Sequence, residues 1–475
     1  MSLKKNIISN FILTASTILF PLVTLPYITR TLSAHNIGRV FYIDSFTQYL
    51  MLFAALGITF YGVREVAKVK ENKQQLSQLT MELVVIQFTL SVLACLCFLC
   101  LPLLFENLRF NSTLVKIGCI SIASNAFMIE WFYQGMENFT FITIRSLILR
   151  SISVLFILFT VTSADDYAVY YLISALGIAL SAAFNFGFFL KNHYASFKWS
   201  KSIFRHLRPL LVLFSINVSI SLYTVMDTII LGSITTPDQV SFYNIPLKIV
   251  KLFWTVMGGI GLVLIPKMSS LFSKNDSAAI QSLMKNSISI VLILGIPFFF
   301  FVLVFPTEVL LIVSGTQYLP AKPSLQILAI VPLIIGLCNV FGTQYLMAIG
   351  MERKILFATI FGFIVSLSLN FGLIPFFGYI GSAIACLCSE LTVCLVVFYH
   401  AKKTIKIHVD YPVLFLILSS ILAAVVSWLL LRTLLHQYYL MFATSFCYLL
   451  AFLLLHFLVF RSHFVNQIIN FRSKS

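Results

Sequence analysis

Charged side chains inside long apolar segments are the residues of this chain that are most suited to binding or transport. A charge near the centre of a bilayer costs roughly 3 kcal/mol or more, so it usually faces a cavity or a partner. Arg150 and Glu390 fall near the middle of such segments. Others fall nearer the ends of theirs: Lys251, Asp227, Arg145, Glu130, Asp44 and Lys248. The alternative for all of these residues is that long side chains reach the interface or form structural ion pairs, and it applies most to Lys248, Asp44 and Glu130.

The basic members of this set have the chemistry of an anion site. Arg presents a planar fork of donors that matches phosphate oxygens. Lys248 and Lys251 are three residues apart, so they share one face of a helix. Arg145 and Arg150 are five apart, and we expect them to point in different directions. We hypothesise a cavity for an anionic head group such as a pyrophosphate, with these candidate residues: Arg150, Lys251, Lys248, Arg145 and Arg30.

The elements that must position these side chains are apolar runs of about 20 residues, each long enough to cross a bilayer. The 475 residues are 60% apolar and 10% charged, against about 45–50% and about 25% in soluble proteins. The sequence therefore predicts an all-α polytopic membrane protein of about fourteen transmembrane helices. The expected spans are 11–30, 40–62, 80–104, 113–133, 141–161, 168–190, 208–232, 245–266, 287–313, 326–348, 355–375, 379–399, 412–432 and 438–460. Pro375 and Gly378 predict a tight turn between the eleventh and twelfth.

The distribution of positive charge predicts the orientation of these spans. With the N-terminus inside, 22 of the 32 Lys and Arg residues fall in inside segments and six in outside segments. Cytoplasmic loops are enriched in Lys and Arg, so we expect both termini to be cytoplasmic. The apolar run after Lys4 and Lys5 lacks a small-residue cleavage site, and we interpret it as the first span rather than a signal peptide.

A weak internal repeat divides the spans into two sets of six. Gly135-Met136-Glu137 ends the fourth span and Gly350-Met351-Glu352 ends the tenth. Residues 37–41 and 240–244 lie in parallel positions after spans one and seven. Two bundles with one orientation around a central cavity are typical of transporters. The predicted domains are a six-helix bundle over 1–190, a cytoplasmic linker over 191–207, a second six-helix bundle over 208–400, and two additional helices with a tail over 401–475.

Composition and motifs disfavour several other classes. The net charge of +16 is explained by cytoplasmic loops, and we expect no nucleic-acid partner. All nine Cys lie within apolar segments without a completing His or carboxylate, so we expect packing rather than a metal site. The longest expected loops run about 16 to 20 residues and carry no catalytic or phosphate-cradling motif, which argues against an enzyme and against a cofactor.

Several stretches resemble one family of exporters, in order and at family spacing over about residues 5–400. Residues 20–33 with Ile37-Gly38 resemble its first helix and loop, and residues 131–137 resemble the end of its fourth helix. Residues 227–232, 240–244 and Lys248 resemble its seventh-helix region. Asn370, Pro375, Gly378, Gly381, Ala383, Ser389 and Glu390 resemble its eleventh and twelfth helices. The family is the polysaccharide transporter branch of the multidrug/oligosaccharidyl-lipid/polysaccharide exporter (MOP) superfamily, with the greatest likeness to O-antigen flippases.

The resemblance implies a function in surface-polysaccharide biosynthesis. It implies translocation of an undecaprenyl-diphosphate-linked oligosaccharide, an O-antigen or related lipopolysaccharide repeat unit, across the bacterial inner membrane by alternating access. Expected partners are the lipid-linked oligosaccharide, the bilayer, and polysaccharide polymerase and chain-length proteins. We hypothesise that Asp227 or Glu390 carries a coupling cation. The extra C-terminal pair of helices resembles flippases of the lipid-linked peptidoglycan precursor. A drug–cation antiporter of the same superfamily is the alternative, and the basic residues in the spans disfavour it.

Overall fold

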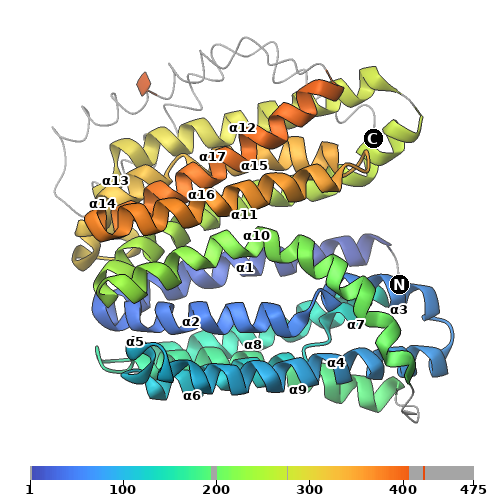
Figure 1. Cartoon of the computed structure of the whole chain (residues 1–475), viewed down its shortest axis with the longest axis horizontal. Coiled ribbons are helices and arrows are strands. Elements are labelled where there is room, and N and C mark those ends of the chain that lie inside the picture. The colour runs from blue at the N-terminus through green and yellow to red at the C-terminus, as the bar shows by residue number, and fades with distance from the viewer. Residues whose placement is uncertain (1–2, 194–200, 275, 406–420, 423–475) are drawn as a thin grey trace. The chain divides into compact units, whose positions relative to one another are not determined.

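The regular elements of the described residues are all helical in the computed structural model of this chain, which describes residues 3–193, 201–274, 276–405 and 421–422 (Figure 1). The chain divides into two compact units. The first contains residues 1–245, 313–317 and 363–386, and the second contains residues 246–312, 318–362 and 387–475. The predicted domain boundaries therefore stay a prediction, and each unit is described separately.

The first unit consists mainly of long antiparallel helices with short breaks between them. Its elements in chain order are α1 (Leu3–Thr31), α2 (Ala34–Ala55), α3 (Ile58–Val69), α4 (Lys73–Cys100), η1 (Leu101–Leu103), α5 (Glu106–Arg109), α6 (Ser112–Asn125), α7 (Glu130–Gly135), α8 (Phe139–Thr160), α9 (Tyr167–His193), η2 (Lys201–His206) and α10 (Leu207–Ile234). Helix α1 packs against α8, α6 packs against α9, and α2 packs against α4, α6 and α10.

The second unit contains shorter helices beside long ones. Its elements are most of α11 (Pro237–Ser273), α12 (Ser277–Val304), most of α13 (Pro306–Val313), most of η3 (Thr316–Ala321), α14 (Lys322–Leu328), α15 (Val331–Asn339), η4 (Val340–Leu346, a π-helix), and parts of α16 (Glu352–Phe377) and α17 (Tyr379–Thr404). Its core joins α12 and η4 to α17 through Ile288, Phe341 and Val397, among other buried side chains. The first residues of α11, the end of α16 and the start of α17 belong to the first unit.

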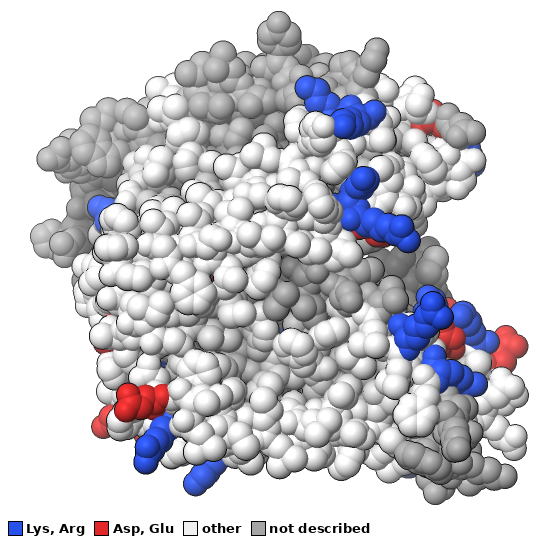
Figure 2. Space-filling model, in the orientation of Figure 1, with Lys and Arg blue, Asp and Glu red and all other residues white. Residues whose placement is uncertain are grey.

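The described surface has the apolar character of a membrane protein. Ten helices among the described residues are long and apolar enough to cross a bilayer. Large apolar side chains stand exposed along them, including Phe159 at 79% and Phe11 at 74%, where lipid can cover them. The face drawn in Figure 2 is mostly uncharged, with the charged side chains near its margins. Apart from residues 421 and 422, the two predicted spans 412–432 and 438–460 lie outside the described residues.

Several predicted spans are interrupted in the structure. The span predicted over 40–62 ends at Ala55, because Leu56 and Gly57 both take left-handed backbone angles (φ 42° and 74°) before α3 begins. The fourth predicted span divides into α6 and α7. The ninth ends at Val304, and Pro306 starts a new helix, as expected of a residue that lacks a backbone donor.

The tight turn predicted between the eleventh and twelfth spans is confirmed. Helix α16 ends at Phe377, α17 begins at Tyr379, and only Gly378 lies between them. Its φ of +53° is in the left-handed region, where glycine carries no side-chain penalty. An added Cβ would lie 1.8 Å from Gln239 Oε1, the atom that accepts the Tyr379 N–H at 3.1 Å. Glycine therefore allows both the turn and the contact with α11.

Candidate functional site

A cavity of about 270 Å³ lies in the first unit, lined by α7, α8 and α9. It is slightly smaller than the ~300–1,000 Å³ of typical small-molecule sites. Helix α8 contributes the stripe Arg145, Ser146, Leu149, Arg150 and Ser153, and these spacings of one, three and four residues follow one face of a helix. The remaining lining side chains are Met128, Glu130, Ser174, Ile178 and Ser181, with Gly177 among them.

Arg145 is the most buried charge of this cavity, with 7% of its surface exposed. Its guanidinium donates to Glu130 and to the Asn185 side chain, and to Ser146 Oγ at 3.0 Å. Its Nε atom is buried without a hydrogen-bond partner among the described residues. A buried charge with one donor unsatisfied is costly unless a further acceptor reaches it. The Arg145 guanidinium is therefore held by its neighbours at both Nη atoms and keeps one donor, Nε, that is unpaired among the described residues.

Arg150 lines the same cavity, and its guanidinium bonds to a different helix from those that Arg145 contacts. Its Nη1 donates to Ser16 Oγ of α1 at 2.5 Å, and the residue is half-buried. Arg145 donates to Glu130 and to Asn185 of α9, whereas Arg150 donates to α1, so the two guanidiniums bond in different directions although both residues line the cavity. Two Arg and one Glu line the cavity, so its charged lining carries a net charge of +1. Four serines add hydroxyl groups: Ser146, Ser153, Ser174 and Ser181.

Asp227 is the centre of a second polar cluster of the first unit. This α10 carboxylate is 1% exposed and accepts three hydrogen bonds. Tyr243 donates at 2.9 Å, Ser366 at 2.8 Å and Asn370 at 2.6 Å. The Asn370 Oδ1 atom is buried without a hydrogen-bond partner among the described residues. Carboxylate, amide and hydroxyl oxygens are the ligands that hard cations prefer.

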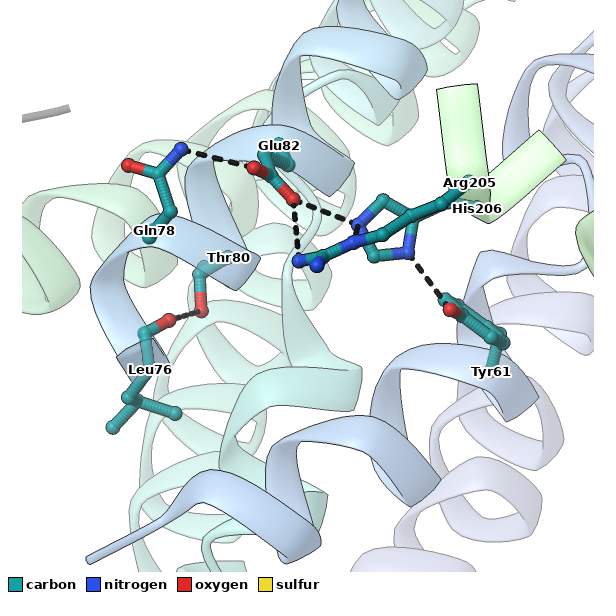
Figure 3. A network of polar contacts seen from close by, with 7 residues as sticks. All are labelled: Tyr61, Leu76, Gln78, Thr80, Glu82, Arg205 and His206. Carbon is teal, nitrogen blue, oxygen red and sulfur yellow. Dashed lines mark hydrogen bonds and ion pairs between the residues drawn. The ribbon is translucent and has the colours of Figure 1, made fainter. Parts of the chain in front are cut away.

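The other predicted site residues lie elsewhere. Arg30 is exposed at the end of α1, where its Nη1 donates to Pro26 O at 2.8 Å. Lys248 and Lys251 are half-buried in α11, within the second unit. Glu390 is 4% exposed in α17 and also belongs to the second unit. Sequence reasoning did not single out Glu82, which pairs with His206 in a buried network (Figure 3).

Within the described residues, no group of three or more His, Cys, Asp or Glu side chains could hold a metal ion. The two polar clusters are instead an Arg-rich cavity and a carboxylate surrounded by donors, both inside a bundle of apolar helices. This arrangement defines a class of protein, an all-α membrane transporter with its polar groups between helices.

Comparisons with known proteins agree with that class. The lipid II flippase MurJ, in an inward closed conformation, superposes with a TM-score of 0.75 and 13% identity, over 96% of this chain and 98% of that one. An outward-facing multidrug resistance MATE transporter of the MOP superfamily superposes with a TM-score of 0.55 and 13% identity, over 84% of this chain and 95% of that one. The predicted all-α transporter fold is confirmed.

The chain belongs to the polysaccharide biosynthesis protein family, whose model matches residues 3–272. It is 24% identical over 399 residues to a protein of Escherichia coli (strain K12) named "Putative O-antigen transporter", covering 83% of this chain and 95% of that one. It is 30% identical over 192 residues to the "Probable low-salt glycan biosynthesis flippase Agl15" of Haloferax volcanii, covering 40% of this chain and 39% of that one. The predicted family is confirmed, and these relatives are transport proteins rather than enzymes.

Proposed function

We propose that this protein moves an undecaprenyl-diphosphate-linked oligosaccharide, an O-antigen or related surface-polysaccharide repeat unit, from the cytoplasmic to the periplasmic face of the inner membrane. The observation that carries the proposal is the Arg-lined cavity of the first unit in a chain of this family. Both termini are cytoplasmic in this proposal, and residues 1–190 and 208–400 form two six-helix bundles. Polysaccharide polymerase and chain-length proteins act with it.

The cavity supports recognition of a diphosphate or an acidic sugar. The lining has two guanidiniums against one carboxylate, and Arg145 Nε is a buried donor that lacks a partner among the described residues. Arg binds phosphate oxygens in a planar, bidentate geometry. The four lining serines offer hydroxyl groups to sugar oxygens. Lys248, Lys251 and Arg30 are further basic residues that would contact the cargo at other stages of transport.

The Asp227 cluster supports a coupling-cation site. A monovalent cation would take oxygens from Asp227, Ser366 and Asn370, replacing hydrogen bonds that those groups now make with one another. Glu390 is the second candidate to carry the cation, because it is a buried carboxylate in α17. Differential binding of cargo and cation to two conformations would then drive alternating access.

Contacts at one end of the first unit support a state closed at that end. Tyr42 of α2 hydrogen-bonds to Ser233 of α10 at 3.1 Å, and Asn107 donates to Gly232 O at 2.9 Å. His35 at the start of α2 contacts Asp238 of α11 at 2.9 Å. This end is periplasmic in the predicted orientation, so the contacts would close the periplasmic exit.

Arg150→Ala tests the proposed function. The substitution removes one of the two cavity guanidiniums, and we expect surface polysaccharide to be abolished when the variant complements a strain that lacks its own flippase. Arg150→Lys, which keeps the charge but not the fork, should restore part of it. The measurement is the polysaccharide ladder on the cell surface, together with accumulation of the lipid-linked repeat unit inside.

Lys116→Ala is the matched control, because Lys116 is an exposed basic residue of α6. It should leave the surface ladder at the wild-type level. All variants are compared at equal protein level in the membrane. A normal ladder from Arg150→Ala at normal protein level would remove Arg150 from the mechanism. Resistance to cationic drugs conferred on a pump-deficient strain, without any effect on polysaccharide, would instead favour a drug antiporter.

A further inference from the structure

A buried acid–base pair lies outside both clusters described above. Glu82 of α4 and His206, the last residue of η2, have side chains that are 1% and 3% exposed. His206 Nε2 lies 2.8 Å from Glu82 Oε2, and His206 Nδ1 lies 2.7 Å from the hydroxyl of Tyr61 in α3. Figure 3 shows the imidazole between the carboxylate and the phenol. Both ring nitrogens are thus engaged by groups from two other helices.

The partners of this imidazole can accommodate either of its charge states. An ionised carboxylate is only an acceptor, so His206 Nε2 carries a hydrogen and donates to Glu82. The Tyr61 hydroxyl can donate to a bare Nδ1 or accept from a protonated one. Proton uptake therefore reverses one hydrogen bond without moving any heavy atom. It also turns the contact with Glu82 into a charge-assisted one, the stronger kind.

The surrounding charges decide whether uptake is favourable. Glu82 Oε2 also accepts from Arg205 Nη2 at 3.2 Å, and its Oε1 accepts from Gln78 at 2.9 Å. Helix α3 adds Glu65, which pairs with both Arg64 at 3.0 Å and Lys68 at 2.9 Å, so this group carries a net charge of +1, and its two basic side chains are exposed to water.

Two positive features oppose a charged imidazole. Arg205 Nε lies 3.4 Å from His206 Nε2, a longer contact than that of Glu82. The Arg205 side chain is 60% exposed, so water screens its repulsion, whereas Glu82 is desolvated. His206 is also the N-cap residue of α10, whose N-terminus is the positive end of the helix dipole and whose first charged residue is Arg208. The buried Glu82 carboxylate at 2.8 Å is the nearest of these charges, and His206 Nε2 points directly at it.

We propose that the Glu82–His206 pair is a proton-binding site that attaches the segment Lys201–His206, and with it the start of α10, to α4. Proton uptake by the imidazole strengthens the attachment, and proton loss weakens it. The segment leads directly into α10, so the site would make the order of the first turn of that helix depend on cytoplasmic pH. Helix α10 also carries Asp227. The proposal rests on hydrogen-bond geometry and does not depend on the nature of the cargo.

Amide hydrogen–deuterium exchange of the purified full chain in lipid nanodiscs tests this. Peptides covering residues 201–210 are compared at about pH 5.5 and about pH 8, the range in which histidine changes charge, after correction for intrinsic exchange rates. In the wild type we expect the protection of these amides from exchange to be about fivefold higher at the lower pH, because a charge-assisted hydrogen bond is stronger than a neutral one. His206→Gln keeps a donor to Glu82 but binds no proton, so the difference in protection between the two pH values (the pH step) should disappear.

Glu82→Gln is the second variant, and it should lose the pH step because it removes the charge that attracts the imidazolium. His400→Gln, which removes a histidine of α17, is the matched control and should keep the wild-type step. If His206→Gln does not fold, the wild type and Glu82→Gln decide. A wild type without a pH step in this segment, or a step that survives in a folded His206→Gln or in Glu82→Gln, overturns the proposal. No cargo is present, so the result is independent of the transport assay.

Discussion

At the scale of the residue, the proposed sites depend on the hydrogen-bond partners of a few buried polar side chains. Asp227 has three donors aimed at its two oxygens, from side chains of α11 and α16. Arg145 is engaged at both Nη atoms, and its Nε is buried without a partner among the described residues. Buried polar groups are normally satisfied, so Arg145 Nε and Asn370 Oδ1, both unpaired within the described part of the chain, distinguish the two clusters to which we assign the proposed cargo and coupling cation.

Asp227→Asn should remove the proposed coupling-cation site with little change in volume. The three donors would then face a neutral amide, part of which is itself a donor, and we expect a loss of stability of about 1–3 kcal/mol. With Na⁺ as the probe cation, we expect its addition to raise the thermal unfolding temperature of the wild type but not that of Asp227→Asn. Asp44→Asn, at a half-buried carboxylate of α2 that accepts from Gln48 at 2.6 Å, is the control and should keep the Na⁺ effect. Equal stabilisation of wild type and Asp227→Asn by Na⁺ would place the cation elsewhere.

Close approaches of backbone determine how the elements of the first unit meet. Gly38 in α2 lies against the start of α11, where an added Cβ would be 1.7 Å from Pro237 O. Gly62 in α3 likewise lies under the Trp131 ring, with an added Cβ 2.4 Å from Cε3. Both positions need glycine because the Cβ atom of any other residue would overlap the neighbouring element at the observed spacing. Gly38 lies at the end of the unit that we propose as the periplasmic exit.

Gly38→Ala should force α2 and the start of α11 apart. The clash is with backbone, which cannot turn away as a flexible side chain would, so we expect a loss of about 1–3 kcal/mol of stability. The thermal unfolding temperature of the purified protein measures it. Gly187→Ala in α9 is the matched control, since an added Cβ there meets nothing within 4 Å. It should be neutral or stabilising by up to about 1 kcal/mol. Equal unfolding temperatures for both variants would contradict the proposed contact.

At the scale of the whole molecule, the distribution of charge and short turns predicts its orientation in the membrane. The turn after α3 contains Lys70 and is followed by Lys73. The turn before α9 contains Asp166, whose carboxylate accepts the N–H groups of Ser163 at 2.7 Å and Thr162 at 2.9 Å. Those backbone donors lower the pKa of Asp166, so this turn keeps its structure and negative charge into mildly acidic medium.

Reporter fusions at these two turns should give opposite signals. Alkaline phosphatase is active only outside the cytoplasm, so a fusion after Asn72 should be inactive and one after Asp165 should be active. A green fluorescent protein fusion should show the reverse pattern, which controls for differences in expression. Activity of phosphatase at both turns would contradict both the proposed orientation and the number of spans between them.

The membrane class, the approximate spans and the charged residues within them follow from the sequence alone. Each of these depends on local composition, since a run of about 20 apolar residues favours the bilayer whatever the rest of the chain does. The Pro375–Gly378 turn was also predictable, because it depends on the conformational freedom of a single residue.

Only the tertiary structure decided which of the charged residues share a site. Arg145 and Arg150 line one cavity with Glu130 and the serines of α9 because α8 packs against α9. Asp227 meets Ser366 and Asn370, which lie 139 and 143 residues away. Glu82 meets His206 across 124 residues. Such pairings depend on packing between distant segments, on which the composition and periodicity of each segment carry no information.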